Sequence, residues 1–280
     1  MRVSSLHVYP LKSTAAIDRE MFEIEARGLR HDRRWMAIDP DGRFVTGRQH
    51  GEMVLIRADP EADGLRLSAP GMPDLHVLAP STDAPRTMAT VWGSEVNAAC
   101  AGADADAWLS AYLKRSLRLV HIDARSHRAV DPAYSQAGDQ VSFADGYPLL
   151  AISQSSLDAL NARIFAGNDR AGSDLAGNGR APLSMARFRP NIVIEDSAAH
   201  AEDGWRQVRI GDVILDAVKP CTRCVFTTVD PRTGLRDDDG EPLNTLKTYR
   251  RTASGITFGM NLIPRSGGVL RVGDAIDVLS

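Results

Sequence analysis

The sequence predicts a mainly β (α+β) protein, and two observations lead to that fold class. Short runs of β-branched, aromatic and aliphatic residues recur between turn signals, a pattern typical of sandwiches and barrels. Helical patterns are few, with about three amphipathic stretches along the whole chain. A chain of 280 residues with 43% hydrophobic residues can bury a sizeable core in one large domain or two ordinary ones.

The first hundred residues are expected to form strands joined by tight turns. The clearest turn signal is Asp39-Pro40-Asp41-Gly42, because proline presets φ and glycine supplies a position with positive φ. The predicted strands of this half are residues 6–9, 21–26, 35–38, 43–46, 54–57, 65–68 and 88–92.

Three helices are expected among the strands. Residues 103–115 place apolar side chains at i, i+1, i+4 and i+5, which makes one stripe of an amphipathic helix. A second helix begins at Ser153, a residue suited to an N-cap, and a third runs from about residue 243 to 250. The remaining predicted strands are residues 117–122, 191–195, 208–217, 225–229, 256–262 and 269–279.

The pattern favours two domains, residues 1–120 and 121–280, because the first helix separates two strand-rich halves of which only the second carries a CxxC motif. Residues 166–182 are rich in Gly, Asn, Asp and Ala with almost nothing to bury, so we expect a mobile loop there.

The composition limits the cellular compartments and the binding partners that we expect for this protein. Neither an apolar signal region nor about 18 consecutive apolar residues occurs, and three cysteines cannot form a fully paired disulfide framework. We therefore expect a cytoplasmic protein with reduced thiols and no membrane partner. A net charge of −3 creates no global positive field for nucleic acid, so any anion site must be local.

Cys221 and Cys224 form the CxxC, and their spacing alone leaves several interpretations open. A structural zinc site lacks a second ligand pair at the usual spacing. A redox dithiol normally opens a helix, whereas residues 225–229 are strand-like here. Both thiols can also be small buried hydrophobes. Arg223 favours a thiolate beside it, which suits a soft metal carried by an anionic organic cofactor.

Basic residues at predicted strand ends can point at one site. Lys12 and Ser13 follow the first strand, Arg33 precedes another, and Arg189 and Asn191 flank Pro190 at a strand entry. Solvated surface charge is the alternative for each of them taken singly.

Six segments together resemble the MOSC-domain proteins, in particular those with an N-terminal MOSC β-barrel, the group that includes the mitochondrial amidoxime-reducing component and its bacterial relatives. PCTRC followed by TTVDP is the most specific of these segments. The segments, in chain order, are YPLKS (9–13), HDRRWM (31–36), DGYPLL (145–150), RFRPN (187–191), KPCTRCVFTTVDPRTG (219–234) and FGMNLIP (258–264).

The resemblance implies an N-terminal β-barrel-like domain, a MOSC β-barrel domain with a few flanking helices, and a molybdenum-molybdopterin cofactor. It assigns the metal and the catalytic centre to Cys224 and leaves Cys221 without a ligand role. The implied cofactor contacts are Lys12, Ser13, Arg33, Asp145, Gly146, Tyr147, Arg189, Asn191, Thr222, Arg223 and Cys224. Lysine and arginine donors suit a pterin phosphate, and amide and backbone groups suit the pterin edges.

The resemblance also implies an activity, the two-electron reduction of N-hydroxylated compounds such as amidoximes, hydroxylamines or N-hydroxylated bases. Three cysteines cannot hold an iron-sulfur cluster as well as molybdenum, no flavin fingerprint occurs, and the chain ends without a ferredoxin-like domain. Electrons are therefore expected from a separate donor protein of ferredoxin, flavodoxin or cytochrome type with its reductase. A carrier of the molybdenum cofactor or of sulfur, and a β-rich scaffold with incidental thiols, are the alternatives.

Three further residues or segments raise questions about the site. The 166–182 segment looks like an insertion relative to the family, and Met260 stands where relatives commonly carry glutamine, which would remove a polar group from cofactor or substrate. Asp230 is a candidate proton donor, and it can equally be a turn residue before Pro231.

Overall fold

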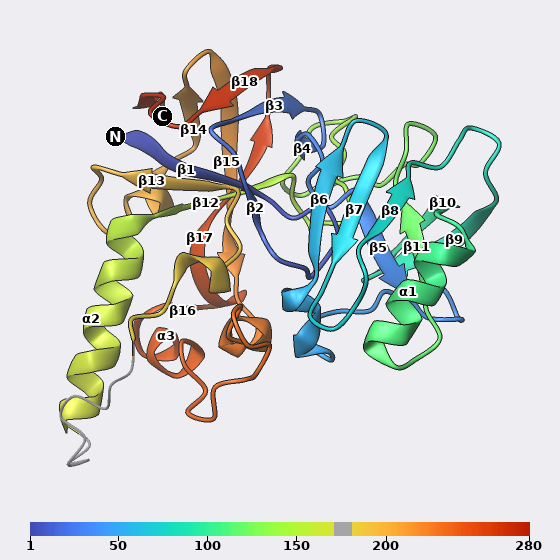
Figure 1. Ribbon diagram of the computed structural model, residues 1–280. Helices are drawn as coiled ribbons and strands as arrows, with labels where there is room; N and C mark the ends of the chain where they lie inside the picture. Colours follow the sequence, from blue (N-terminus) through green and yellow to red (C-terminus); the bar gives the residue numbers. More distant parts are fainter. Residues whose placement is uncertain (171–180) are drawn as a thin grey trace.

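The computed structural model describes residues 1–170 and 181–280, and it is a mainly β protein whose strands curl into two half-barrels (Figure 1). This confirms the predicted fold class. The largest sheet runs in the order β19-β14-β15-β17-β12-β13-β1-β2, with β16 paired to β17. Its strands are β1 (Arg2–Val8), β2 (Ile17–Asp18), β12 (Leu149–Ser153), β13 (Ile192–Glu195), β14 (Gln207–Ile210), β15 (Val213–Thr222), β16 (Arg251–Thr252), β17 (Gly255–Pro264) and β19 (Ile276–Val278).

Three smaller sheets complete the strands of the described residues, in the orders β5-β11-β10-β9, β18-β3-β4 and β6-β7-β8. Figure 1 shows β6, β7 and β8 side by side next to α1. These strands are β3 (Met21–Glu25), β4 (Gly28–Leu29), β5 (Trp35–Ile38), β6 (Arg57–Glu61), β7 (Gly64–Ser68), β8 (Leu75–Leu78), β9 (Arg86–Val91), β10 (Ser94–Cys100), β11 (Arg118–His121) and β18 (Gly268–Arg271).

The three predicted helices are confirmed as α1 (Ala103–Leu113), α2 (Gln154–Arg170) and α3 (Leu243–Tyr249). Ser153 caps α2 as predicted, since its Oγ accepts a hydrogen bond from the backbone N–H of Ser156 at 3.2 Å. Single 3₁₀ turns lie at η1 (Gly51–Leu55), η2 (Met185–Arg187), η3 (Ala201–Gly204) and η4 (Val225–Thr228). None of the helices in the described part of the chain is long and apolar enough to cross a membrane.

The N-terminal strand belongs to the same sheet as the C-terminal half of the chain. β1 pairs antiparallel with β13, and the N–H of Ile276 donates to the carbonyl of Met1 at 3.0 Å, so the two termini lie side by side (Figure 1). The apolar core of this sheet is separate from the core beneath α1, to which Trp35, Trp108 and Leu119 contribute. The predicted domain boundary near residue 120 stays a prediction.

Three strand predictions are wrong, and two others each join two strands that a turn separates. Residues 208–217 span β14 and the start of β15, and residues 269–279 span β18 and β19. Residues 54–57 contribute to η1 and to the start of β6, and residues 43–46 form only isolated bridges at Arg43 and Phe44. Residues 225–229 form the 3₁₀ turn η4, in which the Thr227 and Thr228 hydroxyls donate to the carbonyls of Cys224 and Val225. Threonine is a strand former by propensity, but its hydroxyl also bonds backbone carbonyls in turns, and tertiary packing decides between the two. The argument against a redox dithiol assumed a strand after Cys224, and that assumption is wrong.

The boundary predicted for the 166–182 loop is also wrong at its start, because α2 continues to Arg170. Residues 171–180 lie outside the described residues, and the expectation for that part stays a prediction. The sequence analysis missed several strands, among them β8, β10 and β12, and all five residues of β12 are buried. A continuous buried run lacks the alternation that marks a half-exposed strand.

Candidate functional site

A cavity of about 420 Å³ brings together all eleven residues that the resemblance implies as cofactor contacts. They come from the end of β1, the turn before β5, the segment between β11 and β12, the η2–β13 entry and the β15–η4 connection. The residues are Lys12, Ser13, Arg33, Asp145, Gly146, Tyr147, Arg189, Asn191, Thr222, Arg223 and Cys224. Their convergence is a structural finding, and their roles toward a cofactor stay predictions.

The cavity is strongly cationic. Among the described residues, seven basic side chains line it, whereas Asp145 is the single acidic one. The basic residues are Lys12, Arg33, Arg48, Arg187, Arg189, Lys219 and Arg223. Because the whole chain carries a net charge of −3, this concentration of positive charge is a local feature. An anionic ligand is the partner that such a cavity attracts.

The buried ring of Tyr9 supports two arginines that line the cavity, Arg33 and Arg189. Both guanidinium groups lie over the Tyr9 ring, with the Cζ atoms 4.2 Å (Arg33) and 4.0 Å (Arg189) from its centroid. Arg33 Nη1 donates to Asp32 at 2.6 Å and to Asn191 Oδ1 at 3.1 Å. Asn191 also accepts from the buried N–H of Leu150 at 3.1 Å, so a single amide joins β12 and β13 to Arg33.

Several residues of the cavity have strained backbones. Ser13, Arg33, Trp92 and Arg189 all have positive φ, of 72°, 46°, 54° and 57°, and all four line the cavity. Non-glycine residues in this region cost on the order of 1 kcal/mol or more and persist where the surrounding structure holds them, often at functional sites. For Arg33 and Arg189, the Tyr9 ring and their hydrogen bonds supply that constraint.

Lys12 and Asp145 form an ion pair in the cavity, with Lys12 Nζ 2.5 Å from Asp145 Oδ1. Burial lowers the pKa of Lys12 to about 8, although the neighbouring carboxylate opposes the shift. Enclosure by the surrounding protein works against ionisation of Asp145, but the ammonium of Lys12 outweighs it and holds the pKa of Asp145 well below its usual range. The Trp92 Nε1–H donates to the same carboxylate at 3.2 Å.

The buried Arg128 holds the segment that carries Asp145. Its Nη1 donates to the carbonyl of Ser142 at 2.8 Å, and its Nη2 donates to the carbonyl of Asp145 at 3.0 Å. Burial lowers the pKa of Arg128 to about 10, which still leaves the guanidinium charged near neutral pH. Arg128 therefore fixes the backbone of residues 142–145, which includes the cavity residue Asp145.

The two thiols of the CxxC occupy different surroundings. Cys224 is exposed and directly precedes η4, and Nη1 of Arg48 lies 3.9 Å from its Sγ. Cys221 is half-buried and packs beside the core that includes Phe188 and Phe258. The sequence analysis expected Arg223 to supply the positive charge beside the reactive thiol. In the structure, the guanidinium beside Cys224 is that of Arg48, from a distant segment.

Arg48 and Trp92 are cavity residues that the sequence analysis missed. Both come from the first hundred residues, and neither lies in one of the six motif segments. Gly47 allows this approach, because a Cβ there would lie 2.2 Å from Cε2 of Phe226. A glycine next to an arginine is too common a pair to have served as a signal.

Two expectations from the sequence are corrected. The side chain of Met260 is 2% exposed, packs in the core of the main sheet and does not line the cavity, so no polar group is removed from the site there. Asp230 also lies outside the cavity lining, with Oδ2 3.6 Å from Arg187 and 3.2 Å from Arg232. Partial burial works against ionisation, but the hydrogen bonds from Arg232 lower the pKa of Asp230, which does not suit a proton donor.

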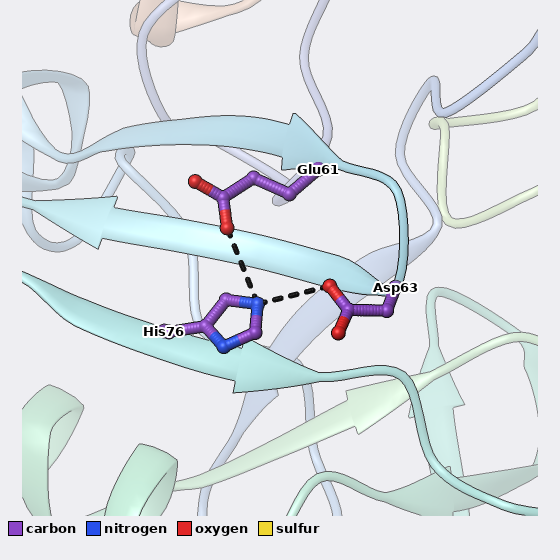
Figure 2. A group of neighbouring side chains, drawn as sticks. All are labelled: Glu61, Asp63 and His76. Carbon is purple, nitrogen blue, oxygen red and sulfur yellow. Dashed lines mark hydrogen bonds and ion pairs between the residues drawn. The ribbon is translucent and has the colours of Figure 1, made fainter.

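Away from the cavity, His76 joins two carboxylates at the end of the β6-β7-β8 sheet (Figure 2). Its Nε2 lies 3.2 Å from Glu61 Oε2 and 3.1 Å from Asp63 Oδ1. The three side chains are exposed, and Arg66 also contacts Glu61 at 3.2 Å. These contacts are those of a surface ion-pair cluster, and we assign no metal to it.

The fold and the cavity together define a class of protein, a mainly β protein of two half-barrel sheets with a cationic cavity that contains one exposed thiol. Two family models match the chain, the MOSC N-terminal beta barrel domain over residues 1–116 and the MOSC domain over residues 138–277. The chain therefore belongs to the MOSC family, in the group with the N-terminal barrel.

Full-length relatives support the same assignment. Mitochondrial amidoxime-reducing component 1 of Mus musculus is 37% identical over 295 residues, covering 99% of this chain and 82% of the relative. The component 1 of Homo sapiens is 34% identical over 297 residues, with the same coverage of 99% and 82%. Mitochondrial amidoxime reducing component 2 of Bos taurus is 33% identical over 292 residues, covering 98% and 82%.

Proposed function

We propose that this protein binds a molybdenum-molybdopterin cofactor and reduces N-hydroxylated compounds with electrons from a separate donor protein. Amidoximes, hydroxylamines and N-hydroxylated bases are the substrate classes. The names of the relatives, which describe amidoxime reduction, support the reaction type.

The proposal rests on two buried hydrogen-bond donors that belong to cavity side chains and have no partner among the described residues. Arg189 Nη2 and Arg223 Nε are buried and have no hydrogen-bond partner in the described structure. An unpaired buried donor costs about 1–3 kcal/mol, and a charged one costs more, so these groups are expected to meet a ligand. Both belong to side chains that line the cavity. A phosphate on an organic cofactor offers the acceptors and the charge that they lack.

The remaining cavity groups fit the other parts of such a cofactor. Cys224 offers an exposed sulfur, and thiolates are preferred ligands of soft metals. The Asp145 carboxylate can accept hydrogen bonds from the N–H groups of a pterin edge. We propose that Lys12, Arg33, Arg189 and Arg223 hold the anionic part, with Cys224 as the metal ligand. The cofactor, when bound, supplies the two-electron redox chemistry.

In this mechanism, the residues of the chain bind and orient the cofactor. The ion pair between Lys12 and Asp145 keeps both groups charged and in place, and Arg128 holds the Asp145 segment from behind. Burial raises the pKa of Tyr147 above its usual range, so its hydroxyl stays protonated and can donate a hydrogen bond near neutral pH. No protein group is assigned as the proton donor to substrate.

The test is to express the chain in a host that makes the cofactor and to measure molybdenum, released pterin and reduction of benzamidoxime with a reduced viologen dye. We expect about one molybdenum per chain and consumption of dye that requires substrate. Absence of metal and pterin from the wild type would contradict the proposal. Metal-loaded protein without any reduction would favour a carrier of the cofactor or of sulfur.

A further inference from the structure

Trp92 is held in an unusual way at the cavity. It follows β9 at the tip of the β9–β10 hairpin with a φ of 54°, and 50% of its surface is exposed. Its Nε1–H donates to Asp145 at 3.2 Å. Left-handed backbone is costly for a bulky residue, and exposure of an indole forgoes burial of a large apolar surface. The hydrogen bond fixes this exposed ring beside the cavity.

Arg48 lies against this ring and reaches the proposed metal ligand. Its Cζ is 4.3 Å from the Trp92 ring centroid and 5.7 Å from that of Phe44, and its Nη1 is 3.9 Å from Sγ of Cys224. The carbonyl oxygen of Arg48 accepts a hydrogen bond from Arg236 Nη2 at 2.8 Å, which anchors the backbone. The guanidinium is therefore held by rings and by its own main chain.

Arg48 differs from the other arginines of the cavity in its partners. Arg33 is bound to Asp32 and Arg187 to Asp237, and Arg189 donates to the carbonyl of Thr14. Within the described residues, the side chain of Arg48 makes no hydrogen bond to an oxygen. It contacts two rings and one sulfur, and its charge also acts on the Asp145 carboxylate. Its N–H donors are therefore available to a molecule that enters beside Cys224.

We propose that Arg48 and Trp92 form the substrate-docking side of the cavity and favour N-hydroxylated compounds whose N–OH group is joined to a flat aromatic skeleton. Arg48 donates to the oxygen of the N–OH group, and the exposed indole of Trp92 covers the flat skeleton. Aryl amidoximes and N-hydroxylated bases have this form. The inference rests on the proposed function and names the substrates that the same site prefers.

The physical basis is the pairing of one directional contact with one broad apolar contact. A guanidinium donates in a fixed planar geometry to a compact oxygen acceptor, and contact of a flat ring with an aromatic side chain tolerates many skeletons. A small aliphatic substrate keeps the first contact and loses the second. We therefore expect the loss of aryl contact to weaken binding about 10-fold, since 1.4 kcal/mol corresponds to a factor of 10.

The experiment uses metal-loaded protein and a matched pair of ligands, benzamidoxime and acetamidoxime, which share the reacting group. Trp35, Trp108 and Trp205 are only 4%, 6% and 7% exposed, so ligand quenching of indole fluorescence reports mainly on Trp92. Calorimetry gives the affinity independently of turnover. We expect benzamidoxime to quench and to bind about 10-fold more tightly than acetamidoxime. Equal binding of the two ligands would overturn the inference.

Two variants and one control separate the contacts. Trp92→Leu should abolish the preference for benzamidoxime, so that the two ligands bind with equal affinity. Arg48→Gln should raise KM for both ligands about 10-fold with molybdenum content unchanged. Met88→Leu, a change at a 52% exposed residue of β9 that does not line the cavity, should alter neither. Loss of molybdenum in Arg48→Gln would place that residue at the cofactor and overturn the inference. A wild-type protein that holds no metal, or that reduces neither ligand, would instead overturn the proposed function.

Discussion

Arg223 Nη1 lies 2.8 Å from the sulfur of Cys221. The arginine between the two cysteines therefore turns its charge to the half-buried thiol, while the exposed Cys224 meets Arg48 from the N-terminal half of the chain. The CxxC is thus an asymmetric pair, with one sulfur packed beside a core and the other at an open cavity.

This asymmetry predicts different outcomes for the two cysteines. Cys224→Ala should remove the proposed metal ligand, so molybdenum per chain should fall close to zero in protein from a cofactor-competent host. Cys221→Ala should keep most of its molybdenum, because that sulfur is committed to Arg223 and to packing against apolar neighbours. Metal analysis of both variants next to the wild type is the measurement. Equal loss of metal from both variants would mean that the thiols act together.

Anion binding to the metal-free protein should depend on the protonation of Lys12. Burial lowers the pKa of Lys12 to about 8, so the cavity loses one positive charge as the pH rises through that value. Sulfate keeps its charge in this range, and its affinity should fall on the order of 10-fold between pH 7 and 9. Calorimetric titration measures this fall. Lys12→Met should bind sulfate weakly at both pH values, and a decline as steep as that of the wild type would assign the effect to another group.

The same pKa has the opposite consequence for stability without ligand. Between pH 8 and the value near 10.4 expected for an unfolded lysine, the unfolded chain binds more protons at Lys12 than the folded chain does. The contribution of Lys12 to the free energy of unfolding therefore rises with pH across this window. In urea unfolding from pH 8 to 10, Lys12→Met should lack this rising component.

Asn191 should contribute more to stability than the other asparagine of the cavity. Its side chain accepts from Leu150 and Arg33 and donates to the carbonyl of His7 at 3.0 Å. Asn191→Ala would leave buried partners unpaired and should lower the free energy of unfolding by about 2–4 kcal/mol. Asn261→Ala removes the hydrogen bond that the Asn261 side chain donates to the carbonyl of Lys219 at 3.0 Å, and should cost about 1 kcal/mol. Urea unfolding of both variants tests this order, which equal losses would contradict.

Acid should weaken the link between β9 and the segment after β11. Asp123 accepts from Arg86 at 2.6 and 3.1 Å, and these hydrogen bonds, with a further one from Ser126, hold the pKa of Asp123 well below its usual range despite partial burial. Because the folded pKa is depressed, the stabilisation is present above the unfolded pKa near 4 and is lost as the pH falls toward the folded value. Arg86→Met should lower the free energy of unfolding by about 2 kcal/mol at pH 7. The difference from wild type should shrink by pH 2, and a constant difference would contradict the assignment.

Much of the fold could be predicted from local patterns. The helices α1, α2 and α3 were predictable because amphipathic spacing and the Ser153 cap are encoded within a few residues. Errors occurred where distant packing decides the backbone, as at residues 225–229, where hydroxyl-to-carbonyl bonds stabilise a 3₁₀ turn. The fully buried β12 was missed because burial on both faces removes the alternation that local reasoning uses.

The sequence by itself determined the family and the eleven cavity residues, because the motif segments that resemble the family, from YPLKS to KPCTRC, keep specific residues at fixed spacing. Only the tertiary structure decided which charge meets which sulfur, that Met260 belongs to the core, and that Arg48 and Trp92 reach the cavity. The physical reason is distance along the chain. Arg48 and Cys224 are 176 positions apart, so their contact depends on how the half-barrels pack and leaves no trace in local spacing.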